Sequence, residues 1–112
     1  MNELSLFTGA GGGLLASHLL GWRCVGAVEI EPYPCSILEA RQRDGMLPYF
    51  PIFQTDIRDF IREGYAALYK GKCDIISAGF PCTPWSNAGQ QLGEDDPRNM
   101  WPSTLACIRE VR

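Results

Sequence analysis

The sequence predicts an α/β fold built on a parallel sheet. Short apolar segments typical of strands alternate with helical segments along the whole chain. The length of 112 residues is that of one domain, and 46% hydrophobic with 21% charged residues is an ordinary globular composition. Where a helix connects two successive strands, the strands run parallel and the crossover is right-handed. We therefore expect one domain of about four βα units.

The first unit contains a run of glycines. Residues 3–7 (ELSLF) form a short apolar strand that leads directly into the loop 8–13 (TGAGGG), and residues 14–20 (LLASHLL) form a helix that ends at Gly21. A glycine loop lets backbone N–H groups at a helix N-terminus approach an anionic or very polar ligand. Because the GxGxxG spacing fails at Leu14, an ordinary dinucleotide site is not expected.

In the second unit an acidic residue follows the strand. Residues 23–28 form the strand, and Pro32 begins a helix that extends to about residue 43. Glu29 stands between them, 20 positions after Gly9, where a carboxylate accepts both hydroxyls of a ribose. Together the glycines and Glu29 favour an adenosine-type cofactor. The alternatives are a purely structural turn and a solvated surface acid.

The third unit is less regular. Residues 52–54 form a weak strand, and residues 57–69 carry apolar residues at helical spacing, although Gly64 lies in the middle of this segment. Thr55 or Asp56 is placed to cap the helix. Taken alone, Asp56 is more typical of a cap than of a ligand, and one side chain can serve in both roles.

The fourth unit contains the most strand-like segment. Residues 74–78 (DIISA) are an unbroken apolar run, typical of a parallel strand buried on both faces. Residues 83–98 are polar and rich in glycine and proline, which indicates a long loop. Asn99 is placed to cap a last helix that carries Pro102 in its first turn and extends to Arg112.

One cysteine differs from the others. The cysteine count is odd, without a CxxC pair, and His18 is the single histidine, so neither a disulfide framework nor a metal site is expected. Cys82 lies beyond a strand end between Pro81 and Pro84, where its thiol can face a pocket, unless it is an incidental loop cysteine. Four other cysteines are interpreted as small core or boundary residues: Cys24, Cys35, Cys73 and Cys107.

The charge balance limits the possible partners. Ten Lys and Arg against 13 Asp and Glu give a net charge of −3, so a nucleic-acid contact would have to be local rather than a polybasic surface. The sequence has no apolar run of about 18 residues and no basic segment at its start. We therefore expect no membrane association and a cytoplasmic, intracellular location.

Four motifs together resemble a known family. The segments LSLFTGAGGG, VEIEP, TDI and GFPCTPWS are similar, in order and spacing, to the first four motifs of the DNA cytosine-C5 methyltransferases. The resemblance covers nearly the whole chain, and the GFPC segment at residues 79–82, followed by Ser86, is far more specific than the glycines. It implies an incomplete Rossmann-like methyltransferase fold. Residues 1–112 would be the amino-terminal cofactor-binding and nucleophile portion of a catalytic domain, of bacterial or phage-like origin, without the target-recognition domain.

The resemblance also implies a site for S-adenosyl-L-methionine. The adenosine part would be held by side chains that follow the strands: Phe7 and Ile30 at the adenine ring, Glu29 at the ribose hydroxyls, and Asp56 with Ile57 at the adenine edge. The methionine part would be lined by backbone groups of Gly9, Ala10, Gly11 and Gly12. Pro81 is a further cofactor-binding position that the resemblance implies.

The resemblance gives Cys82 a chemical role. Cytosine C5 is too weak a nucleophile to accept a methyl group directly, so a Cys82 thiolate would add to C6 and make C5 enamine-like. Neither atom is accessible inside a stacked duplex, so the substrate would be double-stranded DNA with a flipped cytosine. Ser86 is a candidate contact to that nucleotide, or else part of a solvated loop.

Several parts of the family's catalytic domain have no counterpart here. The sequence lacks the Glu-Asn-Val triplet, the Gln-Arg-Arg cluster and a fifth strand beside residues 74–78, so this strand should form a sheet edge open to pairing. We therefore expect the chain alone to be marginally stable and inactive. A longer chain, a complementing carboxyl-terminal polypeptide or self-association would cover that edge.

Two other functions remain open at this point. The chain is alternatively a subunit or remnant that binds S-adenosylmethionine without turnover. It is alternatively part of an RNA cytosine-C5 methyltransferase, because relatives with the same fold and thiol methylate tRNA.

Overall fold

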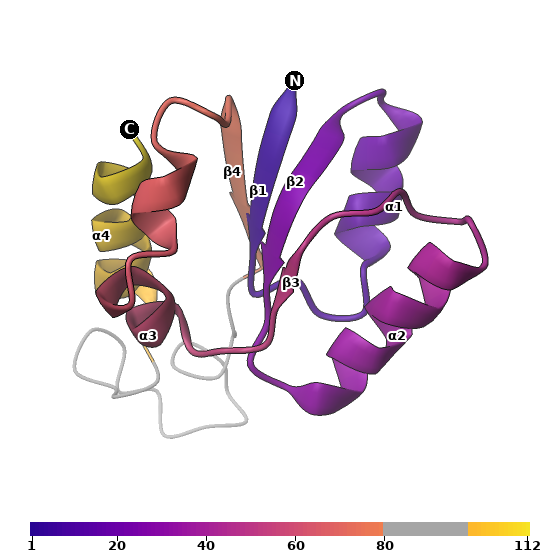
Figure 1. Cartoon of the computed structure of the whole chain (residues 1–112), viewed down its shortest axis with the longest axis horizontal. Coiled ribbons are helices and arrows are strands. Elements are labelled where there is room, and N and C mark those ends of the chain that lie inside the picture. Colours follow the sequence, from indigo (N-terminus) through magenta and orange to yellow (C-terminus); the bar gives the residue numbers. More distant parts are fainter. Residues whose placement is uncertain (80–98) are drawn as a thin grey trace, which may run out of the picture.

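A four-stranded parallel sheet forms the centre of the structure, a computed structural model that describes residues 1–79 and 99–112 (Figure 1). The sheet order is β3-β2-β1-β4, and every pairing is parallel. Its strands are β1 (Asn2–Leu6), β2 (Arg23–Val28), β3 (Ile52–Phe53) and β4 (Ile75–Ala78). The chain moves outward from β1 to β3 and then returns to place β4 on the other side of β1. This arrangement confirms the predicted Rossmann-like α/β class.

Helices cover both faces of the sheet (Figure 1). On one face lie α1 (Gly12–Leu19) and α2 (Pro32–Arg43), and on the other lie α3 (Ile57–Arg62), the 3₁₀ helix η1 (Ala66–Tyr69) and α4 (Trp101–Val111). Each face has its own apolar core. Residues of the first include Leu14 and Leu38, whereas Leu6, Phe60 and Cys107 belong to the second.

The central strand β1 has two chemically different faces. Leu4 and Leu6 are completely buried in the core beneath α3 and α4. Because side chains alternate along a strand, Glu3 and Ser5 face the α1 side. Both polar residues are also buried, at 2% and 5% exposure.

A bulge interrupts the pairing of β1 with β2. Glu3 pairs with Cys24 and Leu4 pairs with Gly26, so Val25 is an extra residue in β2. The register shift places Cys24 in the core beneath α1 and turns Gly26 toward Tyr69 of η1. The Tyr69 hydroxyl donates a hydrogen bond to the carbonyl of Val25 at 2.9 Å.

The predicted helix over residues 57–69 is wrong as a single element. α3 ends at Arg62, and Gly64 adopts a φ of +87°, which an L side chain rarely tolerates. The N–H of Gly64 bonds to the carbonyl of Ile61 and the N–H of Tyr65 bonds to that of Phe60, both at 3.1 Å. This pair of bonds is a Schellman motif, which satisfies the last helix carbonyls and separates α3 from η1.

Other boundaries match the sequence closely. The predicted elements at residues 23–28 and 32–43 coincide with β2 and α2. The cap of α4 is Met100 rather than the predicted Asn99, although the Asn99 side chain accepts a hydrogen bond from the Trp101 N–H at 3.1 Å. The predicted loop at residues 83–98 lies outside the described part. None of the described helices is both long and apolar enough to cross a membrane.

The fourth strand is an edge, as predicted, but it is not buried on both faces. All four residues of β4 are half-buried, because β4 pairs within the described sheet only with β1. The predicted burial is therefore wrong. An apolar composition is equally compatible with an edge that awaits a partner.

We predict that Gly26→Ala destabilises the fold. A Cβ at this position would meet the Tyr69 hydroxyl and lie 2.8 Å from Cζ of the same ring, so the ring would have to move and its bond to Val25 would weaken. We expect a loss of about 1–3 kcal/mol of unfolding free energy in urea denaturation. Introducing the same change into a Tyr69→Phe background should cost less, because the hydroxyl is absent. Gly13→Ala is the matched control and should not destabilise, because apart from the adjoining backbone of α1 no atom of the described residues lies within 4 Å of the new Cβ.

Candidate functional site

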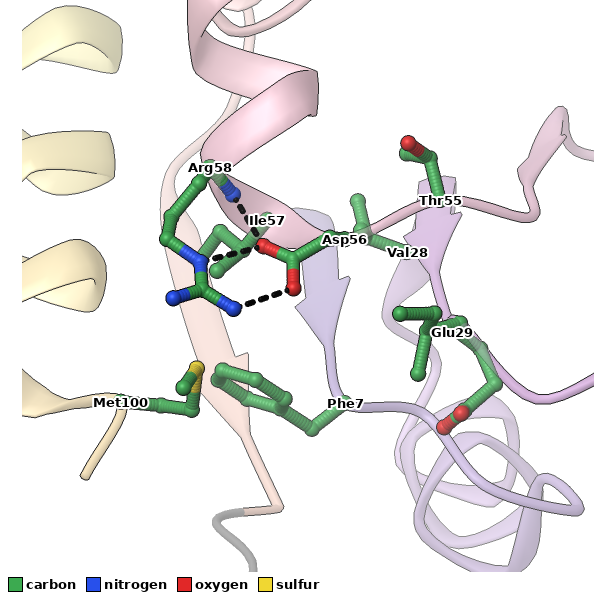
Figure 2. Close-up of a pocket in the computed structure, with 9 residues that line it drawn as sticks. Phe7, Val28, Glu29, Thr55, Asp56, Ile57, Arg58 and Met100 are labelled. Carbon is green, nitrogen blue, oxygen red and sulfur yellow. Dashed lines mark hydrogen bonds and ion pairs between the residues drawn. The ribbon is translucent and has the colours of Figure 1, made fainter. Parts of the chain in front are cut away.

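Side chains from the carboxyl ends of three strands meet around one cavity of about 210 Å³ (Figure 2). Five predicted site residues line it: Phe7, Glu29, Ile30, Asp56 and Ile57. The loops that carry them follow β1, β2 and β3, which are far apart in the sequence and adjacent in the sheet. Ligands of open parallel sheets bind at these strand ends.

The carboxylate of Glu29 connects two loops. Its Oε1 accepts a hydrogen bond from the N–H of Gly9 at 2.8 Å, and its Oε2 accepts one from the N–H of Glu31 at 2.9 Å. Each carboxylate oxygen has about two acceptor positions, so each keeps one for a ligand. The side chain is thus held in place and still able to accept two hydroxyl donors.

Asp56 is both the cap of α3 and part of the cavity wall. Its Oδ1 accepts from the backbone N–H of Arg58 at 2.8 Å and from Nε of the same residue at 2.9 Å, which confirms the predicted cap. Its Oδ2 accepts from Nη2 of Arg58 at 2.8 Å. Hydrogen bonding to Arg58 lowers the pKa of Asp56 below its ordinary value. By the same lone-pair count, Oδ2 keeps one position for a further donor.

Phe7 adopts a strained backbone conformation at the end of β1. Its φ is +52°, the one positive φ among the described non-glycine residues, at a cost of order 1–3 kcal/mol. The strain turns the chain sharply from the strand into the glycine loop while the Phe7 side chain lines the cavity. Gly79 lies against this turn, because a Cβ there would be 3.0 Å from the Phe7 carbonyl oxygen. Gly79 therefore lies next to the turn that carries Phe7.

The glycine loop has a packing role that the sequence did not reveal. Gly9 and Gly11 have φ values of +61° and +95°, and a Cβ at Gly11 would lie 2.7 Å from the Leu38 side chain of α2. Gly11 therefore lets the start of α1 approach α2. None of Gly9, Ala10, Gly11 and Gly12 lines the cavity of Figure 2 in the described part, and their place along the methionine part of a cofactor stays a prediction.

Four residues that line the cavity were not predicted as site residues from the sequence, and one of them, Val28, is the last residue of β2. Thr55 and Arg58 flank the predicted Asp56 and Ile57, so their proximity to the site was detectable in principle. Met100 comes from the start of α4, far along the chain, and no local pattern indicated it. Of the predicted site residues, Pro81, Cys82 and Ser86 lie outside the described residues.

The other cysteines are structural. Cys24, Cys35 and Cys107 are buried and Cys73 is half-buried, all with free thiols, which confirms their interpretation as core or boundary residues. Burial raises the pKa of Cys24 and of Cys107 to about 11. These thiols are therefore protonated and unreactive at neutral pH. Residues 1–79 and 99–112 contain no group of three or more metal-binding side chains.

Comparison with known proteins gives the family. A family model described as C-5 cytosine-specific DNA methylase matches residues 1–112. The type II methyltransferase M.NgoMIV of Neisseria gonorrhoeae is 35% identical over 109 residues, which are 97% of this chain and 32% of that protein. The type II methyltransferases M.PspPI of Psychrobacter sp. (strain TA137) and M.AquIA of Picosynechococcus sp. are 34% and 33% identical over 97% of this chain, and the matches cover 24% and 42% of those proteins.

The chain thus belongs to the C-5 cytosine-specific DNA methylase family. It spans between about a quarter and somewhat under half of the length of these three relatives. The motifs that carried the resemblance lie within the matched range, so the family assignment made from the sequence is confirmed.

We predict that the Asp56–Arg58 pair makes stability depend on pH in the acid range. Because the folded-state pKa of Asp56 is lowered, the pair stabilises the fold above the unfolded-state pKa, near 4, and this contribution is lost as pH falls through the folded-state pKa. Arg58→Gln should cost about 0.5–1 kcal/mol at pH 7, as expected for an exposed pair, and progressively less as the pH falls through the folded-state pKa of Asp56. Urea unfolding at several pH values measures this, and a difference that stays constant down to pH 2 would contradict it.

We also predict that the buried thiols resist alkylation. With pKa values of about 11 and with exposures of 7% and 0%, Cys24 and Cys107 should react with iodoacetamide at pH 8 at least about a hundredfold more slowly in the native chain than in urea. Peptide mass spectrometry gives the rate at each cysteine. Equal rates with and without urea would show that these core positions open freely.

Proposed function

We propose that this chain binds S-adenosyl-L-methionine and supplies the nucleophile for methylation of cytosine C5 in DNA. The observation that carries the proposal is the convergence of Phe7, Glu29 and Asp56 around one cavity at the carboxyl ends of β1, β2 and β3. Membership of the DNA methylase family supports the reaction and the DNA substrate. The bacterial relatives favour the cytoplasm as the place of action.

The cavity has the chemistry that an adenosine group requires. Its apolar wall includes Phe7, Ile57 and Met100, which offer contact surface to a flat base, and the half-exposed Ile30 borders it. The two spare acceptor positions of Glu29 match the two hydroxyls of a ribose. The spare position on Oδ2 of Asp56 matches an amino group at the base edge. The residues present therefore fit the cofactor.

Cys82 would carry out the covalent chemistry on the base. The cofactor supplies an electrophilic methyl group when bound. The Cys82 thiolate would add to C6 of a flipped cytosine, which moves electron density to C5 and makes that carbon nucleophilic. After C5 is methylated, loss of its proton and expulsion of the thiolate would restore the aromatic ring. Ser86 is proposed to contact the same nucleotide, and Pro81 to lie on the cofactor side.

We propose that the remainder of a longer chain, a second polypeptide or self-association completes the site. The chain carries a net charge of −3 and spans only part of its relatives, so most of a DNA-binding surface would come from elsewhere. A cavity of about 350 Å³ between β4 and α4, lined by Cys73, Ile76 and Ile108 among others, borders the open edge of the sheet. An added strand at this edge would satisfy the free backbone groups of β4.

The cofactor assignment is tested by calorimetric titration with S-adenosylhomocysteine. Glu29→Gln leaves fewer acceptor positions and removes the charge from the ribose subsite, so we expect binding to weaken about ten- to a hundredfold. Glu31→Gln is the matched control, because Glu31 bonds to Glu29 through its backbone N–H and not through its side chain. Equal affinities of the wild type and both variants would exclude Glu29 from the site.

The nucleophile is tested by trapping on 5-fluorocytosine DNA. We expect a covalent adduct when the chain is mixed with a polypeptide that supplies the remaining two thirds of a relative such as M.NgoMIV, and none with Cys82→Ser. An adduct that survives Cys82→Ser would remove Cys82 from this role. Cofactor binding without any adduct would favour a binding subunit, and an adduct on 5-fluorocytosine RNA alone would favour the RNA reaction.

A further inference from the structure

A second groove, of about 320 Å³, lies on the α1 side of the sheet between β1 and β4. One end of the groove reaches Phe7 and Gly79 at the carboxyl ends of the strands, next to the site already described. The other end lies toward the amino ends of the strands, beside Glu3 and Trp22. The proposed function does not use this second end of the groove.

Glu3 is an unusual residue in the middle of a packed sheet. It is 2% exposed, and its Oε2 accepts a hydrogen bond from the Ser77 hydroxyl at 2.6 Å. Its Oε1 is also buried and has no hydrogen-bond partner among residues 1–79 and 99–112. The ion pairs found in the described residues involve other acids, Asp44, Asp56 and Asp59. A buried carboxylate with one neutral donor and one unpartnered oxygen costs stability.

Among the described residues, the surroundings of Glu3 offer several acceptors and an aromatic ring but no cationic side chain. Ser5 and Ser17 line the same groove. The Ser5 hydroxyl oxygen accepts a hydrogen bond from the Thr8 hydroxyl, and the Ser17 hydroxyl donates one to the Gly13 carbonyl. Each oxygen keeps at least one further acceptor position. Trp22 also lines the groove, and its ring is the best partner for a cation among the aromatic side chains. A neutral donor would satisfy Oε1 without balancing the charge, whereas a guanidinium or ammonium group would do both.

We propose that the Glu3 end of this groove is a binding site for an organic cation, a guanidinium or ammonium group that donates to Glu3 Oε1. The hydroxyl oxygens of Ser5 and Ser17 accept from its other N–H groups. Such a group is available as the side chain of an arginine or lysine in a covering polypeptide, or as a free amine. Both sources share this chemistry, and the experiment separates them.

The test is an amide NMR titration of the 112-residue chain with ethylguanidinium. We expect saturable shifts at Glu3 and Ser77 with a millimolar dissociation constant. We expect at least tenfold weaker binding in Glu3→Gln, and none with N-ethylurea, which has the same shape without the charge. A second titration, with the peptide N-acetyl-Leu-Arg-Leu-amide and its uncharged citrulline counterpart, tests whether the cation comes from a polypeptide or from a free amine. Tighter binding than ethylguanidinium assigns the cation to a polypeptide, and equal or weaker binding assigns it to a free amine.

A thermal-unfolding measurement separates this role from a purely structural one. Without a probe, Glu3→Gln should leave the unfolding temperature unchanged or raised, because it removes a buried charge. With ethylguanidinium, the wild type should gain stability relative to the variant. Should Glu3→Gln fail to fold, Ser77→Ala keeps the carboxylate and should bind the probe at least as well. Non-saturable shifts, or equal responses in wild type and Glu3→Gln, would overturn the proposal.

Discussion

The carboxylate of Glu29 holds the candidate site together. It ties the loop after β1 to the turn after β2 through two backbone N–H groups, those of Gly9 and Glu31. Hydrogen bonds from N–H groups to a charged acceptor are among the stronger ones in proteins, so two loops from different parts of the chain are fixed relative to each other. Asp56 follows β3, which is only two residues long and pairs only with β2 in the described sheet. The position of Asp56 in the cavity wall therefore depends on how firmly the end of β2 and its Glu29 turn are held.

The same residues serve both folding and the proposed binding. Asp56 caps α3 and retains one acceptor position on Oδ2, and Gly11 allows the start of α1 to pack on α2. The residue type at each of these positions is therefore constrained both by the fold and by the proposed binding. For Asp56 the structural and functional interpretations therefore do not exclude each other, because capping and ligand binding use different lone pairs of one carboxylate.

Much of the fold was predictable, because local chemistry determines it. Strand β2 and helix α2 were found at their bounds from hydropathy and Pro32. The split between α3 and η1 was missed, because helical periodicity continues through Gly64 and only the Schellman hydrogen bonds reveal the break. Of the residues that line the cavity, Glu29 was predicted from its place after a strand, whereas Phe7 and the ligand role of Asp56 were predicted from the family resemblance. Met100 was missed because its approach depends on tertiary packing of α4.

The bulge at Val25 reverses the phase of side-chain alternation within one short strand. Cys24 faces the α1 side of the sheet, whereas Gly26, two residues later, faces η1 on the other side. Strict alternation along the strand would place both residues on the same side. Hydropathy read straight through RCVGAV thus assigns one half of the strand to the wrong face. An insertion or deletion of one residue before the bulge would move the first residues of β2, Arg23 and Cys24, to the opposite faces of the sheet. Ala27 and Val28 after the bulge, and hence the Glu29 carboxylate, would keep their register.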